Sequence, residues 1–308
     1  MEKNNHNHKV RKRHQHQPVN DKNLLVATLL NLVVTIAELA GGIVSNSLAL
    51  LSDALHNLSD TFATFIAYLA SRISKKEANP KKTFGYKRVE ILAAMLNAVI
   101  LIVICIYLFK EAYERIQNPE PINTMIVIVV AMIGLIGNVL SVAILRKDSK
   151  KNINVKAAYV HLIGDSLSSV VVIIAAVSIQ IFELLWIDPI ITVLIGIYLI
   201  REGFVILKET VNILMQATPE NIDLDKIKIK VEALDEVYNI HHMHAWNLTD
   251  HEIHFEAHVD LSADYKLSAV KPVQNKIEKL LKSRFRIHHI TLQFEYDSRH
   301  SGKVISEE

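Results

Sequence analysis

Two short stretches of this chain place a histidine and an aspartate one helical turn apart. "HNLSD" contains His56 and Asp60, and "HLIGD" contains His161 and Asp165. Residues at i and i+4 lie on the same face of a helix. If the two helices pack together, two imidazoles and two carboxylates converge into a tetrahedral set that suits Zn²⁺. Imidazole also suits Co²⁺, Ni²⁺ and Cu²⁺, so the ligand type alone does not select the metal.

Further polar groups accompany these pairs. Asp53 lies on the same stripe as Asp60, and Asn57 is adjacent to His56. We interpret Asp53 and Asn57 as groups that support the ligands or line a path for water. Polar residues elsewhere in the apolar segments together favour a hydrated cavity: Asn31, Glu38, Asn97 and Asn138. The alternative is that each polar group only joins neighbouring helices by hydrogen bonds.

The segments that carry the pairs belong to a chain too apolar for an ordinary soluble domain. Half of the 308 residues are apolar, and the mean hydropathy is +0.23. A membrane-spanning helix needs about 20 mostly apolar residues. Six segments reach this length: 24–44, 48–71, 89–115, 122–145, 155–182 and 189–208. We therefore predict an all-α, six-helix transmembrane domain over residues 23–208.

Lysine and arginine indicate the orientation of these helices. They are concentrated in residues 1–22, 72–88 and 146–156, and they are missing from the alternate connections 45–47, 117–122 and 183–186. Because cytoplasmic loops carry an excess of these residues, both termini should face the cytoplasm. Residues 1–22 form a histidine-rich basic tail. The net charge is only +2, which gives no reason to expect a nucleic-acid partner.

The pattern changes after about residue 209. An amphipathic helix, two alternating strands, a second helix and a third strand follow in the order αββαβ. This order predicts a small cytoplasmic α+β domain over residues 209–297, with helices on one sheet face. Residues 298–308 should form a flexible tail. The single cysteine excludes a disulfide framework or a cysteine metal site within one chain.

Several stretches resemble the cation diffusion facilitators, and among them the bacterial CzcD-like exporters of zinc, cadmium and cobalt. The resemblance covers about residues 22–296 and is carried by these stretches: "NSLALLSDALHNLSD", "TFGYKRVEILAAMLNA", "AAYVHLIGDSLSS", "IHHMHAW" and "IHHITLQFE". The two His-x-x-x-Asp pairs are its most specific part. Lys82 stands where many relatives have a histidine, and the long histidine-rich loop before the fifth helix is missing. The missing loop favours a bacterial plasma-membrane protein.

The resemblance implies a function as well as a fold. It implies a ferredoxin-like cytoplasmic domain, a homodimer formed through that domain, and export of divalent metal in exchange for protons without a prosthetic group. It assigns the transport site to His56, Asp60, His161 and Asp165, and histidine at the first position resembles the zinc-preferring members. It also assigns a regulatory cytoplasmic metal site to the following residues: His241, His258, His288 and Glu295.

We therefore expect a Zn²⁺ efflux transporter of the plasma membrane, with Co²⁺, Cd²⁺ or Ni²⁺ as further substrates, that works by alternating access at the midplane site. Two alternatives remain. A metal-sensing receptor would use the soluble domain as its output. A membrane-embedded metal hydrolase would hold a catalytic ion, but the sequence has no HExxH pattern and no carboxylate placed as a general base.

Overall fold

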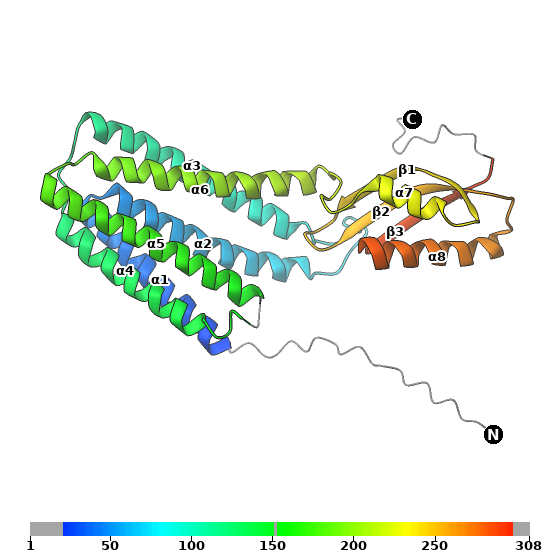
Figure 1. Ribbon diagram of the computed structural model, residues 1–308, viewed down its shortest axis with the longest axis horizontal. Helices are drawn as coiled ribbons and strands as arrows, with labels where there is room; N and C mark the ends of the chain where they lie inside the picture. Colours follow the sequence, from blue (N-terminus) through cyan, green and yellow to red (C-terminus); the bar gives the residue numbers. More distant parts are fainter. Residues whose placement is uncertain (1–20, 151–152, 298–308) are drawn as a thin grey trace, which may run out of the picture. The chain divides into compact units, whose positions relative to one another are not determined.

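The computed structural model describes residues 21–150 and 153–297. Six long helices come first: α1 (Asp21–Ser45), α2 (Leu48–Ser74), α3 (Val89–Gln117), α4 (Thr124–Leu145), α5 (Ile153–Phe182) and α6 (Ile187–Leu214). A shorter set follows: α7 (Leu224–Glu232), β1 (Val237–Asn247), β2 (Ile253–Leu261), α8 (Leu267–Phe285) and β3 (His289–Glu295). This order confirms the predicted helical membrane part and αββαβ domain (Figure 1).

Five of the six long helices are long and apolar enough to cross a membrane, within the residues that the structure describes. The exception is α2, which has 27 residues but carries Asp53, His56 and Asp60 within its length. The polar residues that define the candidate site are therefore the reason that α2 lacks the composition of an ordinary span. The last long helix, α6, continues to Leu214. We expected the membrane domain to end at residue 208.

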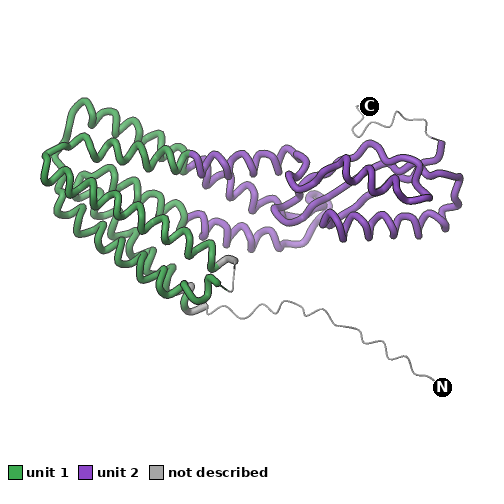
Figure 2. Tube along the Cα trace, viewed as in Figure 1, with its two compact units in different colours: residues 1–61, 101–200 green, residues 62–100, 201–308 purple. Residues whose placement is uncertain are grey.

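The chain forms two compact units (Figure 2). One unit contains residues 1–61 and 101–200, and the other contains residues 62–100 and 201–308. In the first unit, α4 packs against both α1 and α5. Leu50 of α2, Val127 of α4 and Val172 of α5 share one buried cluster, so α2 also packs beside α4 and α5. This packing places the histidine-bearing faces of α2 and α5 in one bundle.

In the second unit, a three-stranded sheet has the order β1-β2-β3. The β1 and β2 strands are antiparallel, while β2 and β3 are parallel. One face of the sheet packs its apolar residues against α7 and α8, as Phe255, Ile227 and Ile277 illustrate. The other face carries polar residues at alternate positions of the strands. The helices therefore cover one sheet face, as predicted, and leave histidines on the other.

Arg115, near the end of α3, departs from the distribution of basic residues that we used for orientation. Its Nη2 donates a hydrogen bond to Asn46 Oδ1 at 2.7 Å, and its Nη1 donates to the Asn46 carbonyl oxygen. Asn46 has a φ of +59° and lies in the tight connection between α1 and α2. The arginine therefore stabilises a turn in a left-handed conformation, and this structural role explains its position.

Asp188 stabilises the start of α2 rather than acting only at the start of its own helix α6. Its Oδ1 accepts hydrogen bonds from Ser47 Oγ at 2.5 Å and from the Ala49 backbone N–H at 3.3 Å. Its Oδ2 accepts one from the Leu48 N–H at 2.8 Å. A carboxylate is favourable at a helix N-terminus, where backbone N–H groups lack partners inside the helix.

We predict that Asp188→Ala lowers the stability of the membrane unit by about 2–4 kcal/mol, because three buried donors lose their acceptor. Thermal unfolding in detergent, followed by far-ultraviolet circular dichroism, should show a clear fall in the midpoint. Asp188→Asn keeps one acceptor oxygen and should lose about half as much. Equal midpoints for the alanine variant and the unmodified protein would contradict this role of Asp188.

Candidate metal centre

The four ionisable side chains of the two His-x-x-x-Asp pairs converge between α2 and α5. His56 Nε2 lies 3.7 Å from Asp60 Oδ2 and 3.9 Å from Asp165 Oδ1. His161 Nε2 lies 3.1 Å from Asp60 Oδ2 and 3.4 Å from Asp165 Oδ2. Each imidazole therefore faces the carboxylate of its own helix and the carboxylate of the neighbouring helix.

These separations fit a common metal ion. Ligand atoms about 2.0–2.2 Å from a tetrahedral zinc ion lie about 3.3–3.6 Å from one another. The four nitrogen-to-oxygen distances, from 3.1 to 3.9 Å, surround this range. His56, Asp60 and His161 can each offer a ligand atom within 4.8 Å of the others. These three side chains could hold one divalent ion, and Asp165, which faces His56 through Oδ1 and His161 through Oδ2, would join them by turning one oxygen toward the ion.

Burial differs across the site. The side chains of His56 and Asp165 are 11% and 3% exposed, whereas those of Asp60 and His161 are 34% and 39% exposed. One edge of the site is thus accessible and the opposite edge is closed. A structural zinc site is normally enclosed on all sides, while a site that must load and release its ion needs an open edge.

Asp53 and Asn57, the predicted supporting groups, form hydrogen bonds with neighbouring helices rather than with the four candidate ligands. Asp53 Oδ1 accepts a hydrogen bond from Ser168 Oγ of α5 at 2.5 Å. Asn57 Nδ2 donates one to Glu38 Oε2 of α1 at 3.0 Å. These bonds orient α2 against α5 and α1, so both residues hold the ligand-bearing helix in position. Ser168 is a partner that the sequence argument missed.

A group of buried polar atoms extends from Asn57 of α2 toward α4. Among the described residues, Glu38 Oε1, Asn57 Oδ1 and both amide atoms of Asn138 are buried without a hydrogen-bond partner. Buried polar atoms of this kind are costly unless water or an ion satisfies them. Gly134 of α4 lies so close to Glu38 that a Cβ atom there would overlap the carboxylate. The polar interior favours the hydrated cavity expected from the sequence.

A second group of possible ligands lies on the open face of the sheet in the other unit. His258 Nδ1 is 2.8 Å from Glu295 Oε1, and His241 Nε2 is 3.8 Å from Glu295 Oε2. Asp260 Oδ2, which the sequence argument did not include, lies 3.9 Å from His241 Nδ1. The three strands β1, β2 and β3 each contribute to this group. It contains three of the four predicted cytoplasmic ligands.

The structure does not bring His288 into this group. Its Nδ1 accepts a hydrogen bond from the Ile253 N–H at 3.2 Å, just before β3 begins. Each residue advances a strand by about 3.3 Å, so seven residues separate His288 from Glu295 by roughly 23 Å. A fully extended β3 therefore keeps the two side chains at opposite ends of the strand.

A β-bulge in β1 turns an additional histidine toward the same face. The pairing moves from His241↔His258 to His244↔Glu256, which leaves one extra residue in β1. His242 within this bulge has a φ of +49°. Its ring centroid lies 4.8 Å from that of His244 and 4.8 Å from that of His258. Ordinary alternation would have placed His241 and His242 on opposite faces.

His254 lies near the start of β2, beside the connection between α2 and α3. Burial, and next the nearby His289, lower the pKa of His254, which favours its neutral form. A hydrogen bond from Lys87 lowers the pKa of Glu252, so this carboxylate stays ionised at neutral pH. The histidines of the N-terminal tail, and His300, lie outside the described residues.

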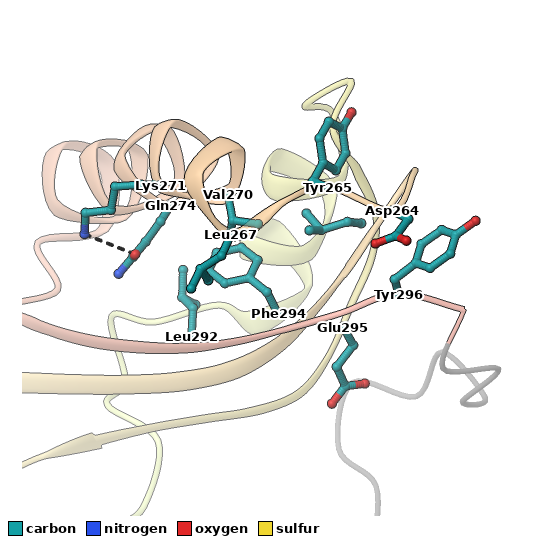
Figure 3. Close-up of a pocket in the computed structure, with 11 residues that line it drawn as sticks. Asp264, Tyr265, Leu267, Val270, Lys271, Gln274, Leu292, Phe294, Glu295 and Tyr296 are labelled. Atoms are coloured by element: carbon teal, nitrogen blue, oxygen red, sulfur yellow. Dashed lines mark hydrogen bonds between the residues drawn. The ribbon is translucent and has the colours of Figure 1, made fainter.

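The second unit also has a pocket of about 680 Å³ between α8 and β3 (Figure 3). Leu267, Val270, Leu292 and Phe294 contribute an apolar wall. Figure 3 shows the Glu295 carboxylate on the opposite side of β3 from Phe294, as strand alternation requires. Glu295 also lines the pocket, but its carboxylate lies on the other side of β3 from the apolar wall.

Five apolar helices together with a polar, ligand-rich interior define a multi-pass membrane protein. Comparison with known families specifies its class further. Residues 24–215 match the cation efflux transmembrane domain, and residues 219–297 match the cytoplasmic domain of cation efflux proteins. The chain therefore belongs to the cation efflux, or cation diffusion facilitator, family.

Three bacterial relatives match nearly the whole chain. The "Cadmium, cobalt and zinc/H(+)-K(+) antiporter" of Bacillus subtilis is 38% identical over 95% of this chain and 94% of its own length. The "Metal cation efflux system protein CzcD" of Cupriavidus metallidurans is 38% identical, with 92% and 89% covered. The "Zinc transporter ZitB" of Escherichia coli is 35% identical, with 96% and 94% covered. These relatives are named as transporters and not as enzymes, as we predicted for this chain.

Proposed function

We propose that this protein exports Zn²⁺ across the plasma membrane in exchange for protons, using His56, Asp60, His161 and Asp165 as its transport site. The observation that carries the proposal is the convergence of these side chains at separations that suit a tetrahedral ion. The names of the relatives support the metal substrate, because each includes zinc or metal cations, and the Bacillus subtilis protein is called an antiporter, which supports the exchange.

Protons supply the switch between loading and release. A histidine must be neutral to bind metal, so protons and Zn²⁺ compete for His56 and His161. With the site open to the cytoplasm, neutral imidazoles and ionised carboxylates take up the ion. The helices then rock to open the site outward, where protons displace the ion and return on the same groups. The half-exposed side of the site, formed by Asp60 and His161, provides the first contact with the incoming ion.

The same proposal includes α2 as a membrane-spanning helix in addition to the five apolar ones, which places both termini in the cytoplasm. It also joins two chains through the cytoplasmic domain. Metal bound to His241, His258 and Glu295 would stabilise one arrangement of that domain. By linkage, it would then shift the equilibrium between the inward-open and outward-open states. Co²⁺, Cd²⁺ and Ni²⁺ are further substrates, because two imidazoles and two carboxylates accept them as well.

Flux through the purified protein tests this function. Proteoliposomes with a zinc-sensitive dye inside should accumulate Zn²⁺ when the lumen is more acidic than the bath, and a protonophore should abolish the accumulation. Swapping the gradient should reverse the direction of flux. A protein that binds Zn²⁺ but moves none under either gradient would be a receptor and would exclude the transporter. Peptide hydrolysis measured in the same vesicles should stay at background.

We predict that His241→Ala combined with His258→Ala removes one Zn²⁺ per chain from the cytoplasmic domain. The metal loses two of its three nearest ligands, so affinity should fall by about 100-fold or more. Atomic absorption after gel filtration at matched free Zn²⁺ gives the count. His251→Ala is the control, because the His251 side chain is 89% exposed and lies beside its neighbour Asp250, away from the group. An unchanged count in the double variant would contradict the cytoplasmic site.

A further inference from the structure

The open face of the sheet has a second gathering of metal-binding side chains. In the sheet register, Trp246 of β1, His254 of β2 and His289 of β3 lie opposite one another. His258 of the first group lies four residues farther along β2, which corresponds to roughly 13 Å. Glu252 precedes β2 and completes the set. We name Glu252, His254 and His289 the turn-side group.

His254 has the properties of a ligand that lacks its ion. Its residue exposure is 3%, and its Nε2 makes no hydrogen bond within the described chain. The nearest carboxylate oxygen, Glu252 Oε1, is 3.5 Å away. This is longer than a hydrogen bond of about 2.7–3.2 Å. It agrees with the separation of about 3.3–3.6 Å between two ligands of one tetrahedral ion.

The third member of the group can complete a ligand set. The ring centroid of His289 lies 4.7 Å from that of His254, and the two rings are inclined by 34°. His289 is exposed, so its side chain can rotate toward the space between His254 and Glu252. Trp246 and Phe84 place their rings 5.5 Å and 5.6 Å from the His254 ring, which excludes water from two sides.

The two oxygens of the Glu252 carboxylate have different neighbours. Its Oε2 accepts a hydrogen bond from Lys87 Nζ at 2.5 Å, while its Oε1 faces His254. Lys87 and Phe84 both belong to the connection between α2 and α3. The lysine therefore fixes the carboxylate without occupying the oxygen that faces the histidine.

We propose that Glu252, His254 and His289 form a further binding site for a divalent transition-metal ion. Two imidazoles and one carboxylate suit Zn²⁺, Co²⁺ and Ni²⁺, with solvent in the remaining position. Because Lys87 and Phe84 contact the same group, an ion at this site borders the connection that follows helix α2 and leads into α3. The site is separate from the group of His241, His258 and Glu295.

Trp246 provides a direct reporter for this ion. The chain has two tryptophans, so Trp186→Phe in the full-length protein leaves Trp246 alone. Ni²⁺, an open-shell ion, should quench Trp246 fluorescence saturably, and excess Zn²⁺ or a chelator should restore it. In this background, His289→Gln should raise the Ni²⁺ concentration for half-quenching about tenfold, and His254→Gln should abolish saturable quenching.

Two matched variants locate the quenching ion. His251→Gln changes an exposed histidine of the same turn and should leave the titration unchanged. His241→Gln combined with His258→Gln empties the other cytoplasmic group and should also leave it unchanged. The proposal is overturned if His254→Gln and His289→Gln titrate like their parent, or if quenching disappears with His241 and His258 instead. Near-ultraviolet circular dichroism of each variant verifies that the domain is folded.

This binding test is independent of transport. The titration contains no gradient and no vesicle, so it succeeds or fails whether or not the protein carries Zn²⁺ across a membrane. Saturable quenching without flux would retain the turn-side site and remove the proposed transporter. Flux without quenching by Ni²⁺ would retain the proposed transporter and remove the turn-side site.

Discussion

Replacing Asp165 by asparagine should reduce Zn²⁺ flux by about 100-fold or more, since loss of even an outer partner of a metal ligand costs 10–100-fold. Asp165 is the least exposed member of the site and contacts both imidazoles. Asparagine has the same shape but no charge, so the fold should persist. Stopped-flow flux in proteoliposomes under a fixed pH gradient measures the effect.

The same experiment requires a control for folding and insertion. Asp165→Asn should elute from gel filtration like the unmodified protein and keep its thermal midpoint. Asp60→Asn should show the same loss of flux, because Asp60 also faces both imidazoles. If either aspartate variant kept its flux at the unmodified level, the shared four-ligand site would be wrong.

Replacing Gly134 by alanine should reduce flux at least about tenfold, although Gly134 touches none of the four ligands. A Cβ at this position overlaps Glu38 Oε1, and Glu38 is fully buried between α1, α2 and α4. The displaced carboxylate would lose its hydrogen bond with Asn57, the neighbour of His56. Overpacking of this kind costs about 1–3 kcal/mol. Flux and thermal stability should fall together.

Gly164→Ala is the matched control for this prediction. Gly164 lies next to Asp165 in α5, yet a Cβ there meets no atom within 4 Å. The substitution should raise the helix propensity of α5 slightly and leave flux unchanged. If Gly134→Ala and Gly164→Ala behaved alike, the contact between α4 and Glu38 would have no role in positioning the site.

Much of the fold was predictable because long apolar runs and alternating strands leave little choice of structure. The His-x-x-x-Asp spacing also predicted that these four side chains converge, since i and i+4 residues share a helix face. By contrast, the Asp188 contact with the start of α2 joins residues about 140 positions apart. Helix-start signals describe only the helix in which they occur, so Asp188 and Pro189 indicate the start of α6 and give no sign of the contact with α2.

The cytoplasmic histidines were harder to assign. Strand alternation separates His241 from His242, but the bulge returns both to one face. A bulge depends on how two strands pair, and neither strand specifies it alone. His288 could have been excluded from the sequence, because an unbroken strand to Glu295 holds the two residues far apart. The proximity of Asp260 to His241 depends on the register between β1 and β2, which the sequence alone does not give.

Zinc K-edge X-ray absorption of the full-length protein lacking His241, His258, His254 and His289 is the most direct test of the transport site. The remaining bound zinc should show two imidazole nitrogens and two carboxylate oxygens at about 2.0–2.2 Å, with no sulfur. Adding His56→Ala and His161→Ala should remove this signal together with the bound ion. A zinc shell without imidazole, or one that survives the loss of both histidines, would contradict the account.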